Sequence, residues 1–155
     1  MRCLKYLMAV MFSLFLISCE VKNESTKPNN EEKINEDNGE EQMELKINDI
    51  LVDVTWYDNE SVKELKKLAK DTLIINMHMY GGFEQVGSIG YTLPSNDVRI
   101  TTNPGDIVLY SSNQLVVFYG NNTWAYTKLG HINLDNNELK SLLSNENVTI
   151  TINLK

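Results

Sequence analysis

Residues 104–120 read PGDIVLYSSNQLVVFYG, in which two short apolar runs, IVLY and LVVFY, flank a Ser-Ser-Asn turn. Short runs of β-branched and aromatic residues bounded by turn residues are typical of β-strands. The stretch therefore predicts a β-hairpin with two strongly apolar strands. This hairpin makes β-sheet the expected main element of the folded part of the chain.

Further alternating runs lie on both sides of this hairpin. Residues 44–47 and 50–56 flank an Asn-Asp turn and predict a second hairpin, and more strands are expected at 73–79, 124–129 and 148–154. The glycine-punctuated stretch 81–104 is long for a loop of a compact domain. Such a stretch is usually functional or carries short elements of its own.

Two short helices are expected among these strands. The first has apolar residues at helical spacing, namely Val62, Leu65, Leu68 and Ala69. Ser61 and Glu64 have the spacing of a capping box, and Asn59 is the alternative cap. Asp135 and Glu138 repeat the capping spacing before a second helix that contains Leu139, Leu142 and Leu143. Many short strands with two isolated short helices predict a mainly β fold, a small closed barrel.

The composition limits the classes of protein to which the chain can belong. Its 155 residues are 42% hydrophobic and 23% charged, which fits one globular domain rather than two. The net charge of −7 argues against a basic surface that binds duplex DNA or RNA, so no nucleic-acid partner is expected. No apolar run reaches the roughly 18 residues needed to cross a bilayer, which argues against a retained transmembrane helix.

The amino-terminal residues have the pattern of a secretory signal. Arg2 and Lys5 precede an uncharged, almost wholly apolar run at 7–18, which ends in Leu-Ile-Ser followed by Cys19. This ending resembles the lipobox of bacterial lipoprotein precursors, in which the cysteine is acylated and the chain is cut before it. The resemblance implies a signal peptide at 1–18, a lipid on Cys19, and a domain anchored to a membrane of the bacterial cell envelope, outside the cytoplasm. Since two or more acyl chains anchor a protein stably, the membrane is an expected partner.

An acidic segment follows the expected anchor. Residues 20–44 hold nine acidic residues against three lysines and almost no aliphatic side chains. Such a segment buries too little apolar surface to offset its loss of conformational entropy, so we expect a disordered tether at 19–43. The folded domain is then expected at 44–155. Because Cys3 leaves with the signal, the mature chain can form neither an internal disulfide nor a cysteine-based zinc site.

Several ordered motifs of the folded part resemble one family. They read GGFEQVG at 81–87, LP at 93–94, PGDIVLY at 104–110, VFYG at 117–120 and WAYTKLG at 124–130, followed by Ile132. Together they resemble the bacterial cyclophilin-like domain family over about residues 45–154. The resemblance implies a cyclophilin-like closed β-barrel with helices at its ends. Members of that family are sometimes fused to, or encoded beside, flavodoxin-like proteins, but no flavin motif is visible here and no cofactor is expected.

The resemblance raises the question of peptidyl-prolyl isomerase activity. Cyclophilins lower the barrier of roughly 20 kcal/mol to X-Pro isomerisation, and an arginine in their apolar proline pocket stabilises the twisted amide. Their Phe-His pair and Gln-Gly-Gly string are absent here, and Arg99, the only arginine after the expected signal, stands in no matching motif. Because a fold alone does not carry an activity, we expect a non-catalytic binding module with no catalytic residues. The alternative is an isomerase with a divergent active site.

Aromatic residues and one acid are the candidate binding residues. Phe83, Tyr91, Trp124 and Tyr126 lie in or beside expected loops, where they can line a cleft for a peptide, a protein or a small ligand. Glu84 is the polar candidate for orienting that ligand. Ordinary barrel packing is the alternative role of each aromatic residue, whereas Phe118 is expected in the core and Asp106 in a turn.

The Met77-His78-Met79 sequence does not predict a metal site. Adjacent side chains of a strand point to opposite faces, so the two methionines are expected in the core and His78 on the other face. No metal ligand set is therefore expected.

Overall fold

Turn residues and alternating apolar residues divide residues 41–155, the part that the computed structural model describes, into ten strands and two α-helices. The expected signal peptide at 1–18, Cys19 and nearly all of the expected tether lie outside these residues. The strands are β1 (Met43–Ile47), β2 (Ile50–Val52), β3 (Val54–Trp56), β4 (Leu73–Tyr80), β5 (Glu84–Ser88), β6 (Val98–Thr101), β7 (Asp106–Tyr110), β8 (Gln114–Phe118), β9 (Thr123–Ile132) and β10 (Asn147–Leu154). The helices are α1 (Glu60–Leu68), which continues into the 3₁₀ turn η1 (Ala69–Asp71), and α2 (Asn136–Leu143).

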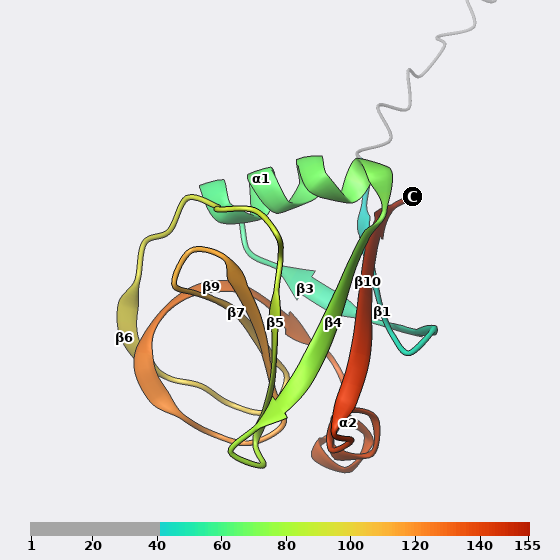
Figure 1. Ribbon diagram of the computed structural model, residues 1–155, viewed down its shortest axis with the longest axis vertical. Helices are drawn as coiled ribbons and strands as arrows, with labels where there is room; N and C mark the ends of the chain where they lie inside the picture. Colours follow the sequence, from blue (N-terminus) through green and yellow to red (C-terminus); the bar gives the residue numbers. More distant parts are fainter. Residues whose placement is uncertain (1–40) are drawn as a thin grey trace, which may run out of the picture. The chain divides into compact units, whose positions relative to one another are not determined.

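The strands form one antiparallel sheet in the order β2-β1-β10-β4-β5-β8-β7-β9-β3, and β6 pairs with β9 outside this path. The two edge strands, β2 and β3, follow each other along the chain across Asp53, so the sheet curls into a nearly closed barrel (Figure 1). The mainly β barrel with two short helices is therefore confirmed. The stretch at 81–104 carries two short strands, β5 and β6.

Local capping begins both helices, and they lie at opposite ends of the barrel (Figure 1). Asn59 caps α1, because its Oδ1 accepts a hydrogen bond from the Val62 amide at 3.0 Å. The Ser61 hydroxyl instead donates to the carbonyl of Pro94 at 2.6 Å. Asp135 and Glu138 form the expected capping box of α2. Neither helix within residues 41–155 has the length and apolar character needed to span a membrane.

Apolar side chains pack on both faces of the barrel wall. The larger core fills the interior and includes Ile107, Leu109, Leu115 and Val117. A second group, which we call the outer cluster, lies on the other face of the same strands and consists of Val108, Val116, Phe118 and Tyr126, with Phe83, Val86 and Ile100 packed against it. This arrangement explains why β7 and β8 are apolar at almost every position. The outer cluster supports the candidate site described below.

The expectation for Met79 was wrong. Met77 is fully buried, as expected, but the Met79 side chain is 41% exposed. The alternation of buried residues along β4 (Leu73, Ile75, Met77) ends at Met77, and the last three residues of the strand are exposed. His78 is also exposed, and its Nδ1 is hydrogen-bonded with Oδ1 of Asn147. The pair therefore contributes a surface contact between β4 and β10.

Candidate functional site

A tight glycine turn places Glu84 at the start of β5. Gly81 and Gly82 link β4 to β5 with φ of 61° and 74°, a left-handed conformation that glycine adopts without steric cost. Glu84 then pairs with Tyr80 on β4 and with Phe118 on β8. The turn thus fixes the carboxyl group next to the outer cluster.

A cavity of about 300 Å³ opens beside this carboxyl group. We call it the Glu84 cavity, and its lining residues are Tyr80, Glu84, Val86, Tyr110, Gln114, Val116, Asn122, Trp124 and Tyr126. The sheet order places β8 and β7 between β5 and β9. Side chains of the two middle strands therefore connect Glu84, on one side, with Trp124 and Tyr126 on the other. The volume lies at the lower end of the range of small-molecule sites, and aromatic walls with few polar groups are typical of such sites.

Glu84 is the unusual polar group of this cavity. Glu84 is only 5% exposed, and its Oε2 atom is fully buried without a hydrogen-bond partner among residues 41–155. Burial raises the pKa of this carboxyl group to about 7, because removal from water disfavours the charged form. A buried polar atom without a partner is destabilising unless a bound group satisfies it. Glu84 is therefore suited to hydrogen-bond a ligand.

Tyr126 forms a fixed wall of the cavity. Its ring packs edge-to-face on Phe118, with centroids 5.7 Å apart, and on Tyr110, with centroids 6.0 Å apart. Its hydroxyl oxygen accepts a hydrogen bond from Nδ2 of Asn122 at 2.9 Å. Burial raises the pKa of the Tyr126 phenol, and the nearby charge of Glu84 raises it further. The wall is thus held by both packing and hydrogen bonding.

Three of the five residues predicted to bind a ligand line one cavity, and two do not. Glu84, Trp124 and Tyr126 lie together, whereas Phe83 and Tyr91 are not among the lining residues. Phe83 packs against the outer cluster, and it lies so close to Gly120 that a Cβ there would be 2.7 Å from the Phe83 Cβ. Tyr91 is 58% exposed in the segment between β5 and β6.

Sequence reasoning missed several lining residues. Tyr80 and Tyr110 each end a strand directly before a turn, and both side chains are at least one third exposed. Their position, an aromatic residue at the solvent end of an apolar strand, is the sequence signal that could have identified them. Asn122 gave no comparable signal, because its role depends on the contact with Tyr126.

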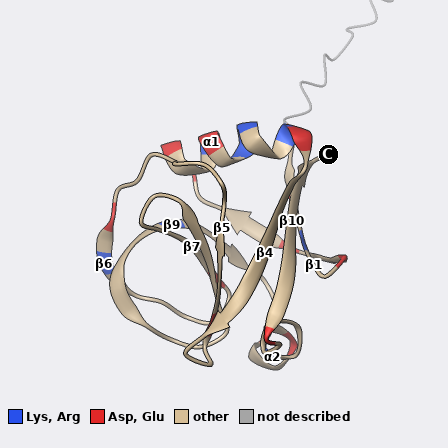
Figure 2. Cartoon of the chain, viewed as in Figure 1, with Lys and Arg blue, Asp and Glu red and all other residues tan. Residues whose placement is uncertain are grey.

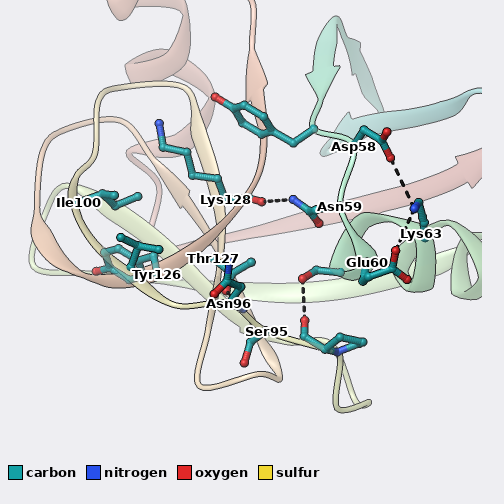
Figure 3. Close-up of a pocket in the computed structure, with 14 residues that line it drawn as sticks. Asp58, Asn59, Glu60, Lys63, Ser95, Asn96, Ile100, Tyr126, Thr127 and Lys128 are labelled. Carbon is teal, nitrogen blue, oxygen red and sulfur yellow. Dashed lines mark hydrogen bonds and ion pairs between the residues drawn. The ribbon is translucent and has the colours of Figure 1, made fainter. Parts of the chain in front are cut away.

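A second, larger cleft lies between the start of α1, residues 94–98 and β9 (Figure 3). Its polar groups bind one another: Nδ2 of Asn59 donates to the Lys128 carbonyl at 2.8 Å, and the Thr127 hydroxyl donates to Oδ1 of Asp97 at 2.6 Å. Lys63 forms ion pairs with Asp58 and Glu60, as the dashed lines in Figure 3 show. Because these polar groups already have partners, whereas Oε2 of Glu84 has none among residues 41–155, the Glu84 cavity is the better candidate for a ligand.

The remaining polar clusters have structural roles. Oδ2 of Asp106 accepts a hydrogen bond from the Asn103 amide at 2.9 Å, which fixes the turn as predicted, and Oδ1 lies 2.9 Å from Nδ1 of His131. In the described part of the chain, no group of three or more His, Cys, Asp or Glu side chains is arranged to hold a metal ion.

Comparison with known proteins agrees with the barrel topology. The model of a family described as the cyclophilin-like family matches residues 45–153, which is nearly the whole described part of the chain. No curated protein sequence matches the chain significantly.

Proposed function

Because the chain belongs to the cyclophilin-like family, we propose that its barrel is a non-catalytic module that binds a peptide, a protein segment or a small ligand in the Glu84 cavity. The observation that carries this proposal is the buried Glu84 carboxyl group, whose Oε2 has no hydrogen-bond partner among residues 41–155, in a cavity with aromatic walls. A ligand that hydrogen-bonds this group removes the cost of leaving it unpaired. The aromatic rings supply the apolar contact area.

The position of Arg99 supports binding over isomerisation. Arg99 lies on β6 opposite Ala125 and is exposed, and it lines neither the Glu84 cavity nor the cleft beside α1. The resemblance to cyclophilins implies that catalysis needs an arginine in the substrate pocket. A protease-coupled prolyl isomerisation assay on the full chain tests this point. If the wild-type chain catalyses isomerisation and Arg99→Ala does not, the isomerase alternative is favoured.

Trp124→Ala is expected to weaken ligand binding without unfolding the domain. The Trp124 side chain lines the cavity but is 54% exposed, so its removal leaves no core cavity. We expect a loss of roughly 2 kcal/mol in binding free energy, which is typical of an aromatic hot spot, and a loss of stability of about 1 kcal/mol or less. The probes are N-acetyl amino-acid amides with neutral, acidic and basic side chains, with binding followed by calorimetry and stability by denaturant unfolding.

Tyr91→Ala is the matched control for this prediction. It removes an aromatic side chain of similar exposure, 58%, that lies outside the cavity. Its affinity for any bound probe should equal that of the wild type. Equal losses in the two variants, or no binding of any probe to the wild type, would contradict the proposed function.

We further propose that a lipid on Cys19 holds this module at a membrane of the bacterial cell envelope. The support is the apolar run that ends in Leu-Ile-Ser before Cys19. Labelled palmitate is expected to enter the wild-type chain and to be absent from Cys19→Ala. Cys3→Ala, which changes the other cysteine, should keep the label. Equal labelling of the wild type and Cys19→Ala would exclude this anchor.

A further inference from the structure

The charge of the Glu84 cavity restricts the ligands that it can bind. Glu84 is the only carboxyl group among the lining residues, and no lysine, arginine or histidine is among them. The neighbouring strand β4 carries no Asp, Glu, Lys or Arg, and its titratable His78 is not among the lining residues. Figure 2 shows charged residues gathered on α1. Within the described residues, the cavity therefore offers an anion no cationic partner, and an ionised Glu84 would repel it.

The aromatic walls favour the opposite charge. Tyr80, Tyr110, Trp124 and Tyr126 come from three different strands and line the same small space. The faces of aromatic rings carry partial negative charge and attract ammonium and guanidinium groups, most strongly where water is excluded. Trp124 and Tyr80, at 54% and 67% exposure, remain accessible to an incoming group. Carboxylate and rings thus both attract a cation.

The hydrogen-bonding groups narrow the choice of cation. Oε2 of Glu84 is an acceptor that receives no hydrogen bond from the described residues, so a group that bears N–H satisfies it. A quaternary ammonium has no N–H to donate and would leave this atom unpaired. A guanidinium or a primary ammonium can donate to Glu84 while its flat or apolar portion contacts the rings.

On the basis of the proposed function, we propose that the Glu84 cavity binds a cationic N–H group, such as the guanidinium or ammonium group of an arginine-like or lysine-like ligand. Glu84 accepts the hydrogen bond and supplies the charge. Trp124, Tyr80 and Tyr110 surround the cation with their rings. The same chemistry occurs in a peptide side chain and in a free small amine or guanidine, and these two sources are separated by experiment.

Binding of a cation should depend on pH through Glu84. Within residues 41–155, the other titratable groups on the elements around it are His78 and Tyr80 on β4, Tyr110 on β7, Tyr126 on β9 and Tyr119 directly after β8. His78 pairs with Val86, two residues from Glu84, so the pH dependence that remains in Glu84→Gln measures the contribution of His78. Burial raises the pKa of the Tyr119 and Tyr126 phenols above its ordinary value. Since the pKa of Glu84 is about 7 in the unliganded fold, affinity should rise with pH up to about 7 and then level off. Below this value it should approach a tenfold loss per pH unit.

The test uses the full chain in a neutral detergent and compares a cationic probe with a neutral one in which a carbonyl oxygen replaces one NH2 group. N-acetyl-arginine amide is the cation, and N-acetyl-citrulline amide is its neutral counterpart of nearly the same shape. We expect the arginine probe to bind at least tenfold more tightly at about pH 8, and this difference to shrink at about pH 5. Glu84→Gln should lose about tenfold or more of the arginine affinity and its pH dependence, whereas Tyr91→Ala should retain both.

Two further probes identify the source of the cation. A capped Gly-Arg-Gly peptide that binds more tightly than agmatine indicates a peptide side chain, and the reverse order indicates a free small cation. Equal or tighter binding of the citrulline probe, or an unchanged arginine affinity in Glu84→Gln, would overturn the proposal. If N-acetyl-citrulline amide binds and Trp124→Ala weakens that binding, the proposed binding function stands. Only the proposal that the ligand is a cation then fails. If no amino-acid amide binds, both fail.

Discussion

Glu84→Gln is expected to stabilise the domain by about 3 kcal/mol at about pH 8 and to change its stability little at about pH 5. The folded chain holds the pKa of Glu84 at about 7, whereas the reference value is 4.5. Between these values the folded state binds more protons than the unfolded state, so the free energy of unfolding falls as pH rises, and it levels off above about 7. Glutamine keeps the shape of the side chain and removes this ionisation.

Denaturant unfolding at the two pH values measures this effect. Glu146→Gln is the control, because it also removes one carboxylate but from an exposed position outside the cavity. The two variants should differ from each other at about pH 8 and agree at about pH 5. A Glu84→Gln variant that is equally stabilised, or destabilised, at both pH values would show that the carboxyl group is not held away from water as the structure shows.

Phe118→Ala is expected to destabilise the domain by about 3–5 kcal/mol, as other truncations of buried aromatic residues do. Phe118 is fully buried in the outer cluster and packs edge-to-face on Tyr126 at 5.7 Å between ring centroids. Removing the ring deprives Tyr126 of its support, so ligand binding should weaken together with stability. Denaturant unfolding of the wild type and of Phe118→Ala at the same pH measures the difference in the free energy of unfolding.

Tyr80→Ala is the matched control for Phe118. It also removes one aromatic ring from the same side of the wall, but Tyr80 is 67% exposed at the rim of the cavity. Its loss of stability should stay within about 0.5 kcal/mol. Similar stability losses in the two variants would mean that the outer cluster is not a packed core.

Local patterns in the sequence were sufficient for most strands and for both helices. The turn at Asn48 and Asp49 was expected because these residues tolerate a left-handed backbone, and both have positive φ. The capping box of α2 was expected from the spacing of Asp135 and Glu138 alone. These features depend on neighbours within a few residues, so the sequence carries them directly.

Features that depend on distant contacts were harder to predict. Ser61 looked like a helix cap, but its hydroxyl bonds to the carbonyl of Pro94, and Asn59 caps the helix instead. β5 and β6 have weak patterns of their own and exist because β8 and β9 pair with them. Burial of Met79 was wrongly expected, because alternation alone does not say where a strand leaves the packed interior.

Some features of the candidate site could likewise be predicted from the sequence, whereas others depend on distant contacts. The sequence by itself singled out Trp124 and Tyr126 as aromatic residues in or beside expected loops, and Glu84 as an acid among glycines and aromatic residues. Only the tertiary structure decided that these residues share one cavity, because the strand order β5-β8-β7-β9 joins segments forty residues apart. It also decided that Phe83 packs against the outer cluster and that Tyr91 lies outside the cavity. Residue type and position near a turn are properties of a short segment, whereas the order of strands follows from the burial of all of them together.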